Sequence, residues 1–197
     1  MGLTIHYSGR FNEHASLSEM IEEVADIAEI YNWTYHVFEE HFPPIDNLGN
    51  AEYDNKIYGI CFTPPECETI NLCFLSNRRM SSAPNLEFFG KSSDEEYKKY
   101  LYMLSAKTQF AGSGTHKLII HLLKYLNKKY FNEFKVIDEG SYWETEDEKL
   151  LEETFKRYTD FLDSVGAALE NIPLKSEETF EEYFNRILKI IQGRRKK

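Results

Sequence analysis

The sequence lacks several features that mark fibrous, secreted and membrane-embedded proteins. It has only three cysteines (Cys61, Cys67 and Cys73) and no CxxC pair, so we expect neither a disulfide framework nor a zinc ribbon. No apolar run reaches the roughly 18 residues that a membrane helix needs. Residues 1–10 carry no basic segment followed by an apolar one, so no secretory signal is expected. These absences predict a cytoplasmic protein with no bound metal and no cofactor.

The composition is that of a folded chain. Hydrophobic residues make up 42% of the 197 positions and aromatic residues 15%, including 13 tyrosines and 14 phenylalanines. A disordered chain is too poor in such residues to offset the entropy lost on ordering. The length is enough for a core that needs no disulfide or metal to hold it together.

Charge is unevenly distributed along the chain. The net charge of −10 divides into −11 over residues 1–70, +6 over residues 71–137 and −5 over residues 138–197. Neutralising a duplex requires clustered positive charge, so the overall acidity disfavours a protein that wraps duplex DNA. The basic middle third still leaves room for a local anion site.

Helical patterns are clearest where a cap precedes an apolar stripe. Ser16 and Glu19 form a capping box ahead of the first stripe, and Thr145 and Glu148 form a second one. Gly193 is expected to end the last helix. Apolar residues recur at helical spacing over residues 17–31, 115–130, 151–169 and 177–192.

Six segments have the composition of strands. The segment 92–110 is ambiguous: Ser93 with Glu96 can cap a helix, and we favour one helical turn followed by a long strand. Residues 63–68 are expected to join two strands as a hairpin. Consecutive strands favour an antiparallel sheet with helices on one face. The predicted class is therefore α+β, with a mostly antiparallel sheet of about six strands and a C-terminal helical hairpin. The strand segments are 3–7, 33–38, 57–62, 69–75, about 100–110, and 134–138.

This pattern predicts one domain with an appendage. Residues 1–145 form the sheet-plus-helix part, residues 146–193 form C-terminal helices packed on it, and residues 194–197 form a basic tail. The last helix has an apolar side, which either packs within the chain or forms a homodimer. The sequence leaves both alternatives open.

The first candidate site is the segment 107–116, which leaves a strand, turns through glycines and enters a helix. Backbone N–H groups at such a helix start can hold an anion, with Lys107 and His116 adding charge and hydrogen bonds. No Lys-Ser/Thr pair follows the last glycine, so this is not a P-loop. Glycines also shape tight turns that bind nothing, and that alternative stays open.

The second candidate site is the segment 138–145, where two carboxylates are followed by a glycine and two aromatic residues. Paired carboxylates such as Asp138 and Glu139 can perturb each other's pKa for acid–base work. Neighbours on a strand point to opposite faces, however, which weakens the pair. The alternative is that Trp143 and its neighbours seal the core and begin a helix.

The motifs KTQFAG followed by a His, at residues 107–116, and DEGSYWET followed by Asp147 resemble those of an uncharacterised bacterial protein family. The segments HYSG (residues 6–9) and FTPP (residues 62–65) are also similar, and the resemblance covers roughly residues 3–155. It implies that these segments belong to one recurring domain, and it implies no activity.

The favoured hypothesis is a non-catalytic binding domain for a small anion or a protein partner, with the site near the two candidate segments. Its ligand-binding candidates are Lys107, Gln109, Gly112, Trp143 and Glu144.

Two alternatives remain. In the first, the chain is an enzyme acting on a small phosphorylated or carboxylated molecule, with His116 as acid/base oriented by Asp138 or Glu139. In the second, the helix stripe of Lys117, His121, Lys124 and Lys128 contacts nucleic acid. This alternative requires the stripe to join Arg78, Arg79, Lys98 and Lys99 in one continuous patch. A solvated helix face explains the same stripe.

Overall fold

The computed structural model describes residues 2–44, 52–92 and 94–194. The chain divides into two compact units, Met1–Leu151 and Glu152–Lys197, and each is described by itself. The class is α+β, as predicted: the described residues form seven α-helices and two three-stranded antiparallel sheets.

The two sheets have the orders β5-β1-β6 and β2-β3-β4, which we name sheet A and sheet B. The predicted hairpin is confirmed, because β3 and β4 pair antiparallel. The bounds of the strands are β1 Thr4–Phe11, β2 Thr34–Val37, β3 Tyr58–Thr63, β4 Ile70–Phe74, β5 Leu104–Lys107 and β6 Phe131–Asp138.

The predicted single sheet of about six strands is not confirmed, because a short irregular segment separates β4 from β1. Its residue Met80 donates its N–H to the carbonyl of Gly9 over 2.9 Å, and Leu75 donates to the carbonyl of Arg79 over 3.0 Å. These are isolated bridges, so no continuous ladder joins the sheets. The phenol of Tyr7 also links them, since it accepts the N–H of Asn71 over 2.8 Å.

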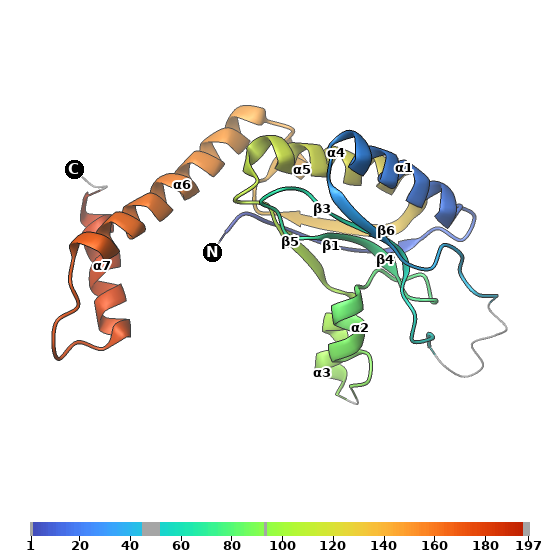
Figure 1. The fold of residues 1–197 in the computed structure, drawn as a ribbon, viewed down its shortest axis with the longest axis horizontal. Helices are drawn as coiled ribbons and strands as arrows, with labels where there is room; N and C mark the ends of the chain where they lie inside the picture. Colours follow the sequence, from blue (N-terminus) through green and yellow to red (C-terminus); the bar gives the residue numbers. More distant parts are fainter. Residues whose placement is uncertain (1, 45–51, 93, 195–197) are drawn as a thin grey trace. The chain divides into compact units, whose positions relative to one another are not determined.

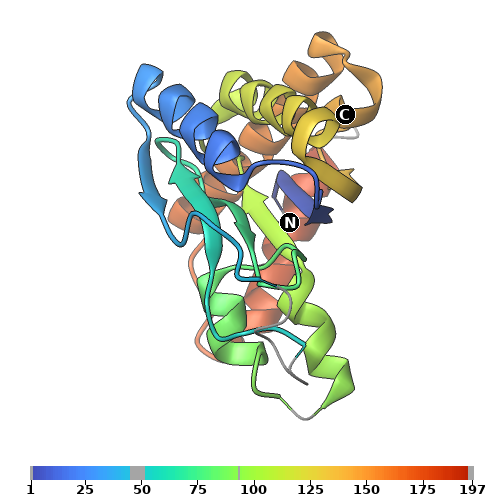
Figure 2. The ribbon, with the colours of Figure 1, turned by 90° about the vertical axis from the view of Figure 1, so that its right-hand side faces the viewer.

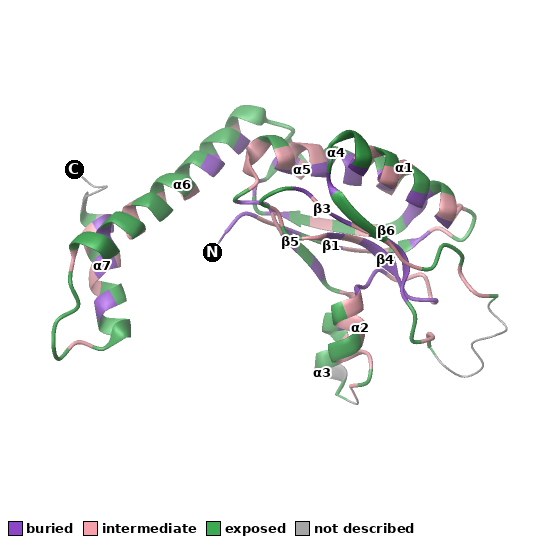
Figure 3. Ribbon diagram, viewed as in Figure 1, coloured by how far each residue is buried: buried purple, intermediate pink, exposed green. Residues whose placement is uncertain are grey.

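Two long helices cover one side of the strands. They are α1 (Leu17–Ile30) and α4 (Gly112–Tyr130), and both lie above the sheets in Figures 1 and 2. The buried residues of α1 face the strands (Figure 3) because its apolar positions repeat at helical spacing. The predicted cap of α1 is confirmed: Ser16 Oγ accepts the N–H of Glu19 over 3.3 Å.

The segment between β4 and α4 is more helical than predicted. Helix α2 (Ala83–Phe89), capped by Ser82, lies partly in a stretch expected to be irregular. Helix α3 (Glu95–Lys98) and the 3-10 turn η2 (Lys99–Tyr102) then precede β5. The predicted long strand is wrong, because only four residues pair with β1. The predicted cap residue Ser93 lies outside the described residues; Asp94 caps α3.

The junction after β6 also differs from the prediction. A single turn, α5 (Tyr142–Thr145), comes first, and α6 (Glu148–Asn171) follows. Asp147, and not Thr145, begins α6, because its Oδ1 accepts the N–H of Lys149 over 2.9 Å. The hydroxyl of Thr145 instead donates to the carbonyl of Ser141 over 2.6 Å.

The second unit holds most of α6 and α7 (Phe180–Arg194). Gly193 lies inside α7 and does not end it. A capping box absent from the sequence predictions begins α7: Glu182 donates its N–H to Thr179 Oγ1 and accepts the N–H of Thr179.

Tail residues 195–197 lie outside the described residues. The predicted packing of these helices on the sheet domain, and the homodimer, stay predictions. The unit's buried cluster is Ala168, Tyr183, Ile187 and Ile191.

Candidate functional site

Sheet A has one covered face and one open face. Along β1, Ile5 and Tyr7 are buried while His6 between them is exposed, as the alternation of a strand requires. The pairing of β1 with β5 and β6 places His6 between Ser105 and Ile137. The open face is therefore built from the residues that point away from α4.

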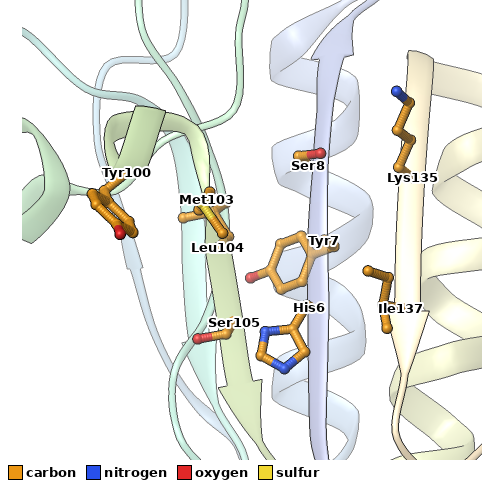
Figure 4. Close-up of a pocket in the computed structure, with 9 residues that line it drawn as sticks. All are labelled: His6, Tyr7, Ser8, Tyr100, Met103, Leu104, Ser105, Lys135 and Ile137. Carbon is orange, nitrogen blue, oxygen red and sulfur yellow. The ribbon is translucent and has the colours of Figure 1, made fainter. Parts of the chain in front are cut away.

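A groove runs along this open face. It consists of two cavities of about 380 and 360 Å³, which share Ser8 and Lys135. Figure 4 shows that the first cavity takes side chains from all three strands and from the turn before β5. The groove is lined by His6, Tyr7, Ser8, Gly9, Arg10, Arg79, Tyr100, Tyr102, Met103, Leu104, Ser105, Glu133, Lys135 and Ile137.

One end of the groove is cationic. Arg10 and Arg79 are direct backbone partners in an isolated bridge, and Lys135 lines the same cavity. Among residues 2–44, 52–92 and 94–194, none of these three cations forms an ion pair. Glu133 is the acidic residue in the lining. Three positive charges thus share a small space with one negative charge.

A neighbouring ring and a backbone carbonyl hold the two arginines in place. The guanidinium of Arg79 lies over the ring of Tyr102, 3.3 Å from its centroid, and Arg10 Nη1 donates to the carbonyl of Asn77 over 3.2 Å. The phenol of Tyr102 donates to Glu52 over 3.0 Å. Burial raises the pKa of Tyr102 to about 12, so the ring stays neutral beneath the guanidinium.

The other end of the groove is apolar and aromatic. Met103 and Ile137 are 58% and 69% exposed, although both are large apolar residues, and Tyr100 is 41% exposed. The ring of His6 lies on β1 between them (Figure 4). Exposed apolar side chains grouped in a concave site are typical of a surface that binds something.

The sequence-predicted catalytic residues meet on the opposite, covered face. His116 Nε2 lies 3.0 Å from Asp138 Oδ1, and His116 Nδ1 lies 2.7 Å from Thr108 Oγ1. We call these three residues the buried chain. They join the end of β5, the first turns of α4 and the end of β6.

The hydrogen bonds of the buried chain follow from its geometry. An ionised Asp138 carboxylate can only accept hydrogen bonds, and its Oδ1 lies 3.0 Å from His116 Nε2. Asp138 also accepts the backbone N–H groups of Gly140 and Tyr142, each over 2.7 Å, and of Trp143 over 2.9 Å. Burial alone would raise the pKa of Asp138, but the bond to His116 and these N–H groups outweigh it and lower that pKa.

The order hydroxyl, imidazole, carboxylate is one that nucleophilic enzymes use. The distance that the enzyme hypothesis requires between His116 and a carboxylate is therefore met. However, the side chains of His116 and Asp138 have no exposed surface, and Thr108 is also 0% exposed. No substrate atom can reach the hydroxyl in this arrangement. The buried chain of Thr108, His116 and Asp138 therefore links β5, α4 and β6 structurally.

The remaining predicted site residues separate from this pair. Lys107 lies over the ring of Phe110, 5.4 Å from its centroid. Gln109 is buried, and its Oε1 has no hydrogen-bond partner within the described part of the chain. Glu144 is exposed on α5. Gly112 is the first residue of α4, with a φ of +85° that favours glycine.

Two further candidates have partners near the edge of sheet A. The ring of Trp143 contacts that of Phe134 at 5.9 Å. Glu139 accepts the N–H of Thr4 over 2.9 Å and lies 3.9 Å from His6. Glu139 is thus adjacent to the groove and not to His116, because neighbouring strand residues face opposite ways.

The predicted lysine stripe on α4 has partners along most of its length. Lys117 forms an ion pair with Glu148 over 3.1 Å, and Lys124 forms one with Glu146. His121 shares a hydrogen bond of 3.1 Å with the phenol of Tyr142. Glu146, which follows α5, and Glu148 of α6 therefore compensate much of the stripe's positive charge.

The sequence predictions did not group the residues that line the groove. Arg79, Lys98 and Lys99 entered only as neighbours that the lysine stripe would need, and His6, Arg10 and Lys135 entered no predicted site. The available signal is the segment 97–102 (YKKYLY), which groups three tyrosines and two lysines just before β5. The position of Arg10 beside Arg79 depends on tertiary structure.

Comparisons with protein-family models, with curated proteins and with solved structures find no match. The family resemblance noted from the sequence motifs stays a prediction. In the part of the chain that the structure describes, no helix has the length and apolar character needed to cross a bilayer. Within the same residues, no group of three or more His, Cys, Asp or Glu side chains is placed to hold a metal ion.

Proposed function

We propose that this chain is a binding domain for organic anions that combine an apolar body with an anionic group, and that the groove on sheet A is its binding site. The observation that carries the proposal is the convergence of Arg10, Arg79 and Lys135 at one end of the groove without a carboxylate partner in the described residues. This keeps the predicted binding role and moves its site to the opposite face of the same strands.

Electrostatics supports an anionic ligand at this end. Like charges directly opposite one another on paired backbones are destabilising, and Arg10 and Arg79 stand in that relation. An anion placed between them would relieve the repulsion and gain charge-assisted hydrogen bonds. Arginine is suited to this role because its planar guanidinium can bind a phosphate or carboxylate through two N–H groups.

The other end supports an apolar ligand body. Met103, Ile137 and the ring of Tyr100 present apolar surface beside Lys135, which lines both cavities. A small molecule binds where burial of its apolar part supplies affinity and a few polar groups fix its orientation. A simple inorganic ion would leave this half of the groove unused.

The two alternatives have less support. A role for His116 as acid/base would require the buried chain to open, because its side chains have no exposed surface. Contact with nucleic acid through α4 would require Lys117 and Lys124 to exchange their carboxylate partners for phosphates. The groove needs neither change.

The proposal is tested with phenyl phosphate, which has one ring and one anionic group. Titration followed by methyl NMR is expected to shift the resonances of Ile137 and Met103 saturably. Phenol, which lacks the charge, is expected to shift them far less. Ile30, an isoleucine of α1 that is 74% exposed, is the internal control and should not move.

Arg79→Gln should weaken phenyl phosphate binding by about tenfold, the value of one hydrogen bond to a charged group. Binding that leaves Ile137 and Met103 unshifted, or that is the same in Arg79→Gln, would show that the groove is not the anion site.

A further inference from the structure

We infer that the organic anion bound in the groove is a single-stranded nucleic acid. This inference rests on the proposed function and names its ligand class. It is carried by a row of exposed aromatic and basic side chains that continues from the groove onto α3 and η2, beyond what a small anion could contact.

The row begins at the apolar end of the groove. Tyr100 lines the first cavity, and the ring of Tyr97 lies 6.4 Å from it, centroid to centroid. Tyr97 is 55% exposed. The ammonium of Lys99 lies 5.2 Å from the centroid of the Tyr100 ring. Bases stack on exposed aromatic rings of this kind whatever their sequence, and nearby lysines hold the phosphates.

The groove is long enough to follow a strand. From His6 to Arg10, β1 rises about 13 Å at about 3.3 Å per residue. Aromatic rings stand at one end and guanidinium groups at the other, with Lys135 between them. A single strand can place bases on the rings at one end and phosphates on the cations at the other, whereas one nucleotide leaves the Tyr97 end without a contact.

The surface suits unpaired bases better than a duplex. A base can stack on Tyr100 only if it is not already stacked between neighbouring bases in a double helix. The net charge of −10 opposes a broad phosphate-wrapping surface, but it does not oppose a narrow cationic groove. An open antiparallel sheet face is also a known platform on which bases can be laid out.

The test is fluorescence anisotropy of the full chain with a labelled oligouridine of about 12 nucleotides, within the usual range of site sizes for one domain. We expect it to bind at least tenfold more tightly than uridine monophosphate, measured by competition. With three phosphate contacts, the logarithm of the binding constant should fall with log salt at a slope of about −2.

Two substitutions separate stacking from charge. Tyr100→Leu should weaken oligouridine binding by about tenfold and leave the salt slope unchanged. Arg79→Gln should reduce the magnitude of the slope by about 0.7. The matched controls lie on α4: Tyr125→Leu removes a tyrosine that is 47% exposed, and Lys128→Gln removes an exposed charge. Neither control should alter binding.

The outcomes distinguish this inference from the proposed function. If phenyl phosphate binds in the groove but oligouridine binds no more tightly than uridine monophosphate, the inference is overturned and the proposed function stands. If neither binds, both are wrong. Equal affinity for a duplex of the same length, or a loss of binding in Lys128→Gln but not in Arg79→Gln, would also overturn the inference.

Discussion

Sheet A carries polar side chains on both faces, and the two sets differ in how they are satisfied. On the covered face, Thr108, His116 and Asp138 bond to one another and to backbone groups, without exposed side-chain surface. On the open face, Arg10 and Arg79 stand side by side without a carboxylate partner in the described chain. Buried polar groups that are satisfied stabilise a fold, whereas neighbouring cations on an open face fit the anion site that we propose.

The largest effect is expected for Asp138→Asn. The amide leaves His116 without a buried negative partner and replaces an oxygen that accepts backbone N–H groups by a donor. Leaving buried N–H groups without their carboxylate acceptor is expected to cost about 3 kcal/mol of the free energy of unfolding. Urea unfolding measures this loss, and the matched control Glu144→Gln, on the exposed side of α5, should change the free energy by less than about 0.5 kcal/mol.

Asp138 also predicts how stability depends on pH. Its pKa is lower in the folded chain than in the unfolded chain, so the unfolded state takes up the proton first. Its contribution is therefore complete above about 3.9, the ordinary pKa of aspartate, and is lost as the pH falls through the lower folded pKa. When wild type and Asp138→Asn are unfolded thermally from neutral to acidic pH, the difference between their Tm values should become smaller. A constant gap would contradict this account.

A smaller effect is expected for Thr108→Val, which keeps the shape of the side chain and removes the hydroxyl. His116 Nδ1 then loses its 2.7 Å partner, at a cost of about 1–2 kcal/mol in the free energy of unfolding. Phenyl phosphate binding should be unchanged, since Thr108 faces away from the groove. If binding falls with stability kept, the buried chain belongs to the functional site and the division between the faces is wrong.

The smallest effect on stability is expected for Lys135→Gln. This substitution removes a cation from the groove, so the free energy of unfolding should change by no more than about 0.5 kcal/mol and in the stabilising direction if repulsion dominates. A loss above about 2 kcal/mol by urea unfolding would mean that the lysine is structural.

The sequence predicted local features better than surfaces. The cap at Ser16 and the α4 segment follow from residues close together in the chain, and both are confirmed. Thr145 was given a capping role that Asp147 performs, because both residues have the chemistry of a cap and only the backbone path selects one.

The candidate site was only partly predictable. The enzyme hypothesis placed His116 beside Asp138, and the structure does bring them together. The groove requires knowing which face of β1 the helices leave open and that Arg79 returns beside Arg10. Such pairings are decided by tertiary packing, and no repeating pattern of residues in the sequence predicts them.

The central claim is that Arg10, Arg79 and Lys135 on the open face bind organic anions. It is tested most directly by titrating phenyl phosphate into wild type, Lys135→Gln and Lys128→Gln and following the Ile137 methyl resonance. The account predicts a dissociation constant about tenfold higher for Lys135→Gln, as for the loss of one charged contact, and no change for Lys128→Gln. Equal affinities in all three proteins, or a loss confined to Lys128→Gln, would contradict it.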